Sequence, residues 1–228
     1  MRLWLRNALW DQVPRDHRAT PEALRRRQWV TGVVVVLGGV VLGLSLRLEP
    51  GSPWFYVASL GLSSIWALGA FASGPLHLGR IMHSEGLGRP VAAPFILGLA
   101  LAGVFVAGAL VVRQVPWLAR QVGDVTAFVE QGSIPLIVLI TATTGAAEEL
   151  FFRGAVYAAT PRHPVLVSTA LYTLATYATG NVMLTFAAVV LGLLVGLQRR
   201  ASGGIMAPII THLTWSLTML FALPLIFV

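Results

Sequence analysis

Apolar runs of about twenty residues recur along most of the chain and constrain its fold more than any other feature. A helix needs about 20 mostly apolar residues to cross the ~30 Å hydrocarbon core of a bilayer. Only helices and closed barrels satisfy their backbone in lipid, and these runs are far too long for barrel strands. The sequence therefore predicts an all-α polytopic membrane helix bundle of about seven transmembrane helices. The expected spans are 28–46, 53–74, 92–112, 134–158, 164–179, 182–198 and 204–227.

The charge content supports a membrane protein and argues against nucleic-acid binding. Only 11% of the residues are charged and 56% are hydrophobic, whereas a soluble domain carries roughly 25% charged residues. The net charge of +7 comes from Arg side chains at the ends of the apolar runs. Membrane proteins distribute basic residues in this way. We therefore expect the chain to bind no nucleic acid.

The Arg residues also predict an orientation. Of the 16 basic residues, all of them Arg, three fall in segments on one side of the bundle: Arg47, Arg113 and Arg120. The remaining 16 − 3 = 13 fall on the side of the N-terminus. Because basic residues are retained on the cytoplasmic side, the N-terminus is expected inside the cell and the C-terminus outside. The expected location is the plasma membrane, most simply a bacterial inner membrane.

No domain boundary divides the apolar part of the chain. Residues 1–27 read as a cytoplasmic or interfacial N-terminal segment, and 28–228 as a single transmembrane domain. Within 1–13, apolar residues recur at helical spacing, as in a helix that lies on the membrane surface. Residues 114–132 are too polar to span and are expected on the outer surface.

Two GxxxG pairs predict close helix packing. Gly39 and Gly43 lie in the first span, and Gly192 and Gly196 lie in the sixth. Small residues at this spacing let helix backbones approach closely. Packing within the same chain is favoured over a dimer interface.

Ionisable side chains inside a bilayer are costly and therefore indicate function. The segment GAAEELFFRG, residues 145–154, places two carboxylates and a guanidinium in the fourth span. Glu149 and Arg153 are four apart on a helix and can form an ion pair. Glu148 lies about 100° round the helix from Glu149 and meets a different neighbour. One carboxylate is thus structural, and Glu148 is free to act as a general base.

A histidine in the last span is expected at a similar depth. His212 lies about 12 Å from the inner boundary, close to the estimated depth of Glu148. Ser216 follows four residues later on the same helix face. Matching depths predict that Glu148 and His212 meet in one cavity. The last four spans are expected to form that cavity and to open it toward the cytoplasm.

These residues resemble the CAAX-protease and bacteriocin-processing family of intramembrane peptidases. Glu148, Glu149 and Arg153, continuing FFRG, are similar to the family's first motif, and the resemblance covers about residues 130–220. It implies that the first Glu and two His surround a water, or in some accounts a metal. It also implies that the second Glu pairs with the Arg, and that the last His, with an Asn, holds an oxyanion.

The chain departs from the family pattern at two positions. In the second motif Tyr172 is the aromatic residue, but Thr176 stands at the position where the family has His. The third motif keeps its histidine, His212, but Ser216 stands at the position where the family has Asn. Threonine cannot act as a base near neutral pH and is a poor metal ligand. The departures leave the expected fold unchanged and predict impaired catalysis.

Two functions stay open on these grounds. The first is an intramembrane peptidase, with Glu148 as base, Glu149 and Arg153 in support, and His212 with Ser216 at the oxyanion. Its substrate would be a membrane-embedded or lipid-anchored protein. The second is a pseudoprotease that binds or scaffolds a membrane protein complex. No cofactor is assigned; a divalent metal such as zinc would have Glu148 and His212 as ligands. A transporter is disfavoured because the internal charges cluster at one level.

Overall fold

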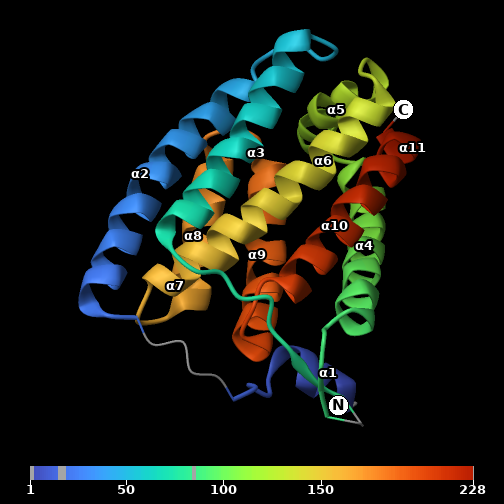
Figure 1. Ribbon diagram of the computed structural model, residues 1–228. Coiled ribbons are helices and arrows are strands. Elements are labelled where there is room, and N and C mark those ends of the chain that lie inside the picture. The colour runs from blue at the N-terminus through green and yellow to red at the C-terminus, as the bar shows by residue number, and fades with distance from the viewer. Residues whose placement is uncertain (1–2, 15–18, 84–85, 228) are drawn as a thin grey trace.

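The computed structural model describes residues 3–14, 19–83 and 86–227, and their regular structure is almost entirely helical (Figure 1). The long helices are α2 Pro21–Ser45, α3 Pro53–Ser73, α4 Ala92–Val112, α6 Ile134–Glu148, α9 Val182–Ser202 and α10 Met206–Ala222. Helix α6 continues directly into η1 Glu149–Val156 and α7 Tyr157–Ala159. The shorter elements are α1 Leu3–Leu9, α5 Pro116–Glu130, α8 Pro164–Tyr177, α11 Pro224–Phe227 and the antiparallel strands β1 Ile81–His83 and β2 Gly86–Gly88. The predicted all-α membrane bundle is confirmed.

Six helical segments in the described part of the chain are long and apolar enough to span a bilayer. The fifth expected span, 164–179, is not one of these six; it corresponds to α8, which has 14 residues. At 1.5 Å per residue α8 is about 21 Å long, short of the ~30 Å hydrocarbon core. Helix α8 packs instead against α9 and α2 within the bundle.

The two glycine pairs hold α8 in place. A Cβ atom on Gly43 of α2 would lie 2.7 Å from the Ala178 carbonyl oxygen at the end of α8. A Cβ atom on Gly192 of α9 would lie 2.9 Å from Thr169 Cγ2 on α8. Both contacts require glycine because a side chain would collide with the neighbouring helix. Packing within the chain, as favoured by the sequence, is confirmed.

An aromatic cluster fills the core between α3, η1 and α8. The Trp66 ring stacks on Phe151 at 4.8 Å between centroids and lies 5.0 Å from Phe152. The Phe152 ring in turn lies 5.1 Å from Tyr172 of α8. Offset and edge-on aromatic pairs of this kind add stability beyond the area they bury. The cluster therefore fixes η1 and Tyr172 relative to each other.

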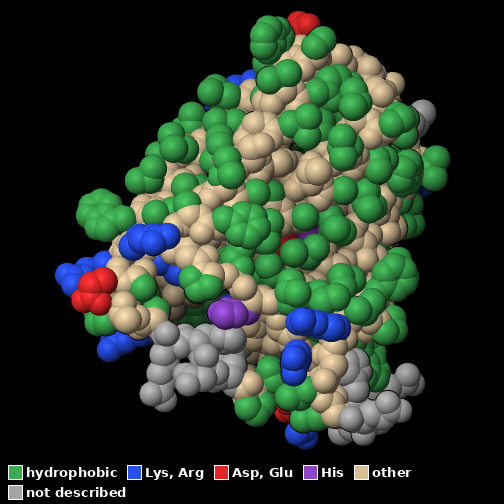
Figure 2. Space-filling view, in the orientation of Figure 1, with side chains coloured by type: hydrophobic (Ala, Val, Ile, Leu, Met, Phe, Trp, Pro, Cys, Tyr) green, Lys and Arg blue, Asp and Glu red, His purple; other side chains and the backbone are tan. Residues whose placement is uncertain are grey.

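The surface separates into an apolar body and a charged end. Figure 2 shows hydrophobic side chains over most of the visible face and most visible Arg side chains near the end that holds the N-terminus. Helix α1 lies at that end against α9, with Ala8 buried. It ends at Leu9, short of the expected 1–13, and Arg2, Arg15 and Arg18 lie outside the described residues. Helix α5 lies at the opposite end (Figure 1).

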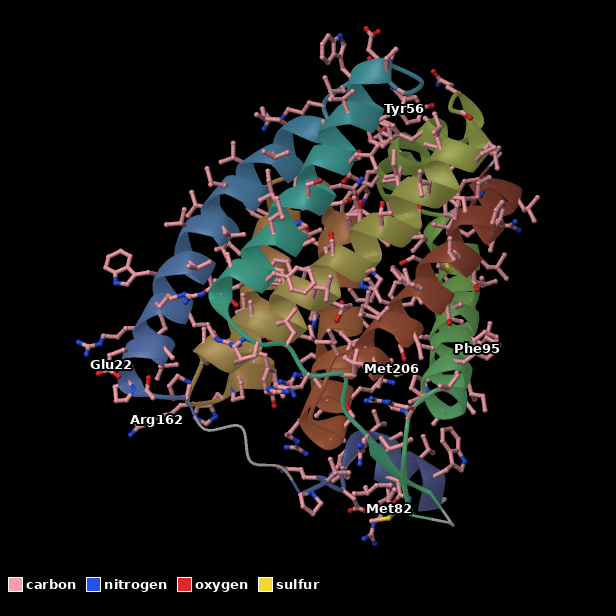
Figure 3. All side chains as sticks on the ribbon, viewed as in Figure 1. Glu22, Tyr56, Met82, Phe95, Arg162 and Met206 are labelled. Carbon is pink, nitrogen blue, oxygen red and sulfur yellow. The ribbon has the colours of Figure 1, made fainter. Side chains whose placement is uncertain are left out.

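The orientation remains a prediction, and the exposed loops offer a direct test. Glu22 and Arg162 lie at the N-terminal end of the bundle, and Tyr56 lies at the other end (Figure 3). The chain has no Cys, so single cysteines can be labelled without background. With the N-terminus inside, we expect a membrane-impermeant thiol reagent to label Glu49→Cys in intact cells and Arg162→Cys only after permeabilisation. The reverse pattern would invert the predicted topology.

Candidate active site

The two carboxylates stand where the fourth span changes its helical form. Glu148 is the last residue of α6, and Glu149 is the first residue of η1, an eight-residue π-helix. A π-helix has i→i+5 hydrogen bonds, is rare in proteins, and is frequently found at functional sites. The sequence predicted a regular α-helix here, and no feature of the residues signalled the change. The wider helix turns both carboxylates toward the same histidine of α10.

Glu149 is the centre of a fully buried ion cluster. Its Oε1 accepts a hydrogen bond from Arg153 Nη1 at 3.1 Å, and both side chains have no exposed surface. The predicted ion pair is therefore confirmed. The same Oε1 lies 2.8 Å from His212 Nδ1. This second partner was not predicted, because the depth count placed His212 beside Glu148 alone.

Glu148 lines a cavity, and its partners differ from those of Glu149. The Tyr172 hydroxyl donates a hydrogen bond to Glu148 Oε2 at 2.9 Å. His212 Nε2 lies 3.9 Å from the same oxygen. The prediction that Glu148 and His212 lie together at one cavity is confirmed. The gap between the two groups is wider than a direct hydrogen bond.

The contact with Glu149 determines which nitrogen of the His212 ring carries a proton. An ionised carboxylate can only accept hydrogen bonds, so His212 Nδ1 carries the proton in this contact. Nε2 is then left directed toward Glu148, as a lone pair or, in the charged ring, as a second donor. In either form of the ring, Nε2 faces the Glu148 carboxylate across the 3.9 Å gap.

Tyr172 is the residue that sequence reasoning missed. It was noted only as the aromatic of the second motif, yet its hydroxyl contacts Glu148 and its ring lies 4.7 Å from the Arg153 guanidinium carbon. A cation over an aromatic face is attracted by the ring quadrupole. Tyr172 thus links both ends of the EExxxR segment. The sequence did offer one sign of this role: Tyr172 carries a hydroxyl and lies one helical turn before Thr176.

Thr176 and Ser216 lie beside the carboxylates without joining their hydrogen bonds. Thr176 Oγ1 donates to the Tyr172 carbonyl oxygen of its own helix at 3.0 Å. Ser216 lines the same cavity as His212, but among the described residues no hydrogen bond joins the two. Tyr172, one turn below Thr176, is therefore the α8 residue at the level of Glu148.

A cavity of about 280 Å³ opens beside Glu148, Tyr172 and His212. Its walls include residues of α2, α3 and α5, among them Ser45, Phe55 and Val125. All four of the last expected spans line the cavity, as predicted, and α2, α3 and α5 also contribute to its walls, which the sequence did not predict. The cavity extends from the carboxylates toward the end of the bundle that holds α5, away from the N-terminus. With the predicted orientation this is the outer half, so the expected opening toward the cytoplasm is not found for this cavity.

The donor set does not match a catalytic zinc site. Such sites have three protein ligands, usually His with Glu or Cys. In the described part of the chain, no three His, Asp or Glu side chains are arranged to hold a metal ion. Of the two candidate ligands, Glu148 is already bonded to Tyr172 and His212 to Glu149. The described residues therefore do not fit a metal ion.

Comparison with known families gives one match. Residues 130–218 match the model of the family described as type II CAAX prenyl endopeptidase Rce1-like. Neither the curated proteins nor the solved structures contain a match to the chain. The matched region runs from α6 to α10 and contains every residue of the buried cluster. The resemblance seen in the EExxxR motif is thereby confirmed for this region.

Proposed function

Because residues 130–218 match the Rce1-like endopeptidases, we propose that the protein is an intramembrane peptidase with Glu148 as its general base. One observation carries the proposal: Glu148 and His212 Nε2 face each other across 3.9 Å at the wall of a cavity inside the bundle. A water held there would lie within reach of both groups. The buried Glu149–Arg153 pair supports the arrangement from behind.

Hydrolysis then follows from these positions. Glu148 takes a proton from the water as the water oxygen attacks the scissile carbonyl carbon. Negative charge develops on the carbonyl oxygen, and protonated His212 donates Nε2–H to it while Glu149 balances the charge of the ring. The carbon–nitrogen bond breaks as Glu148 passes its proton to the amine. The products are one carboxyl and one amino terminus, so every atom of the water is accounted for.

An adjoining apolar pocket suggests the class of substrate. A cavity of about 360 Å³ lies between α4, α5, α9 and α10, and its lining is almost wholly apolar. It shares four residues with the walls of the cavity beside Glu148: Val125, Leu184, Ala187 and Trp215. Trp215 Nε1 is a buried donor without a partner among the described residues. A substrate with a lipid or transmembrane anchor could fill the apolar pocket and offer a backbone carbonyl to Trp215.

The proposal is tested with matched substrates. The purified chain in lipid nanodiscs is given one peptide sequence in two forms, with and without a lipid or transmembrane anchor, and products are identified by mass spectrometry. We expect cleavage of the anchored form at least tenfold faster, because anchoring raises the local concentration. Equal cleavage of both forms would remove the assignment of a membrane-anchored substrate.

Tyr172→Phe measures the contribution of the hydroxyl to this site. A hydrogen bond to a charged group contributes about 1.5–3 kcal/mol, so we expect kcat to fall roughly 10- to 100-fold. The ring is kept, but loss of the same hydrogen bond should lower the melting temperature by several degrees, so kcat is compared well below both melting transitions. An unchanged kcat would mean that the Tyr172 hydroxyl has no part in the reaction.

A second function is favoured by one specific contact. Thr176 stands where the family pattern has a histidine, and its hydroxyl is bonded to the backbone of its own helix. This side chain offers no base to the cavity, as expected of a pseudoprotease that serves as a scaffold subunit. Purification from native membranes distinguishes the two: a stoichiometric membrane-protein partner together with absent peptidase activity would favour the scaffold.

A further inference from the structure

A second cavity, of about 460 Å³, lies at the N-terminal end of the bundle. The start of α2, the segment after α3, the α7 region and the end of α9 form its walls. Among the described residues, its lining contains three arginines, Arg26, Arg27 and Arg199, together with His77, and no Asp or Glu. No residue in the described part of the chain lines both this cavity and the cavity beside Glu148.

Backbone carbonyl groups hold two of these arginines, Arg26 and Arg27, in place. Arg26 Nη2 donates to the Ala72 carbonyl oxygen at 2.8 Å, and Arg27 Nη2 donates to the Pro75 carbonyl oxygen at 3.0 Å. A guanidinium has five N–H donors, so one carbonyl bond leaves others available. Carbonyl oxygens also cancel none of the formal charge. Arg26 and Arg27 therefore bring two neighbouring positive charges to this wall, and an anion would balance them.

Arg199 ties this cavity to the catalytic helix. Its Nε donates to the Arg153 carbonyl oxygen at 2.7 Å, and its guanidinium carbon lies 4.7 Å from the Tyr157 ring centre. Gly154, the next residue of η1, lines the cavity. An occupant of this cavity would therefore contact η1 at Gly154.

The depth of the cavity indicates a lipid headgroup. On α2, Trp29 is 77% exposed, and large exposed side chains follow at Val33, Val36, Leu37, Val40 and Leu44. Tryptophan marks the level where hydrocarbon meets headgroups, and the apolar row beyond it faces lipid tails. Arg26 and Arg27 lie about one helical turn before Trp29, at headgroup level. Basic pockets between helices at this level bind anionic headgroups.

We propose that this cavity binds the phosphate group of an anionic phospholipid whose acyl chains lie along the exposed face of α2. The phosphate contacts Arg26 and Arg27, and Arg199 forms the inner wall. The site is independent of peptidase activity and would exist equally in a scaffold protein.

The test uses the full chain purified in a neutral detergent. Lipid retention by native mass spectrometry and the melting temperature are measured with phosphatidylglycerol, with phosphatidylcholine of the same acyl chains, and with inorganic phosphate. Each basic residue near an anionic lipid surface contributes about fivefold in affinity. We expect Arg26→Gln to weaken phosphatidylglycerol binding about fivefold, and Arg26→Gln with Arg27→Gln about 30-fold. Arg26→Lys with Arg27→Lys should keep most of the binding, and the distant control Arg113→Gln should keep all of it.

Three results would overturn the proposal. Equal retention of phosphatidylcholine and phosphatidylglycerol would mean that charge is not recognised. If inorganic phosphate raised the melting temperature as much as phosphatidylglycerol does at the same concentration, the cavity would be a site for small anions. Arg26 is exposed, so Arg26→Gln should not disturb folding. If this variant bound phosphatidylglycerol as tightly as the wild type, the lipid would bind elsewhere.

Discussion

Arg153→Ala is expected to destabilise the protein by roughly 3–5 kcal/mol, the cost of breaking a buried ion pair. Arg153 and Glu149 have no exposed surface, and removal of the cation leaves the carboxylate with only His212 as a partner. The change also removes the guanidinium that lies over Tyr172. The measurement is the melting temperature and the yield of folded protein in a defined detergent.

Two matched variants separate this effect from a general loss of charge. Arg25→Ala removes a cation from an exposed i,i+3 pair with Glu22, and exposed pairs contribute little, so its melting temperature should stay close to that of the wild type. Glu148→Gln keeps the side-chain shape and should also melt near the wild type. If Arg153→Ala melted as these two do, the Glu149–Arg153 pair would contribute nothing to stability.

Thr176→His is expected to raise peptidase activity by about 10²–10⁴, the usual contribution of one placed acid–base group. Thr176 lines the cavity beside Glu148, one helical turn beyond Tyr172. An imidazole at this position is longer than threonine and can reach a water held near Glu148. The measurement is kcat on the anchored reporter, with the wild type measured in parallel.

A neighbouring position provides the control. Thr179 lines the same cavity three residues further along the chain, so Thr179→His adds an imidazole farther from Glu148. We expect no gain from Thr179→His, nor from Thr176→His combined with Glu148→Gln. Equal gains at both positions would mean that any added base helps. No gain from Thr176→His would show that the missing histidine is not what limits the rate.

Hydropathy predicted the bundle well because lipid requires long apolar helices. The span expected at 92–112 coincides with α4, and that at 134–158 nearly coincides with the helical segment from Ile134 to Ala159. Counting residues along each span also brought Glu148 and His212 to one level. These properties depend on distance along the helix axis, which the sequence determines directly.

Properties that depend on rotation about the helix axis were harder to predict. The π-helix at Glu149 redirects both carboxylates, and nothing in the composition of ELFFRGAV indicated it. The second partner of Glu149 and the Tyr172 hydroxyl bond depend on how α10 and α8 turn toward η1. The cavity extends toward the α5 end because α2, α3 and α5 form part of its walls, and sequence periodicity does not specify such contacts between distant segments.

The most direct test of the central claim compares wild type with Glu148→Gln on one anchored reporter in nanodiscs, with products identified by mass. Glutamine keeps the shape of the side chain but cannot accept the proton of the attacking water. If Glu148 is the general base, the wild type produces a defined cut, and the variant produces none above the uncatalysed background while melting at the same temperature. A wild-type cut that survives Glu148→Gln at the same rate would contradict the account.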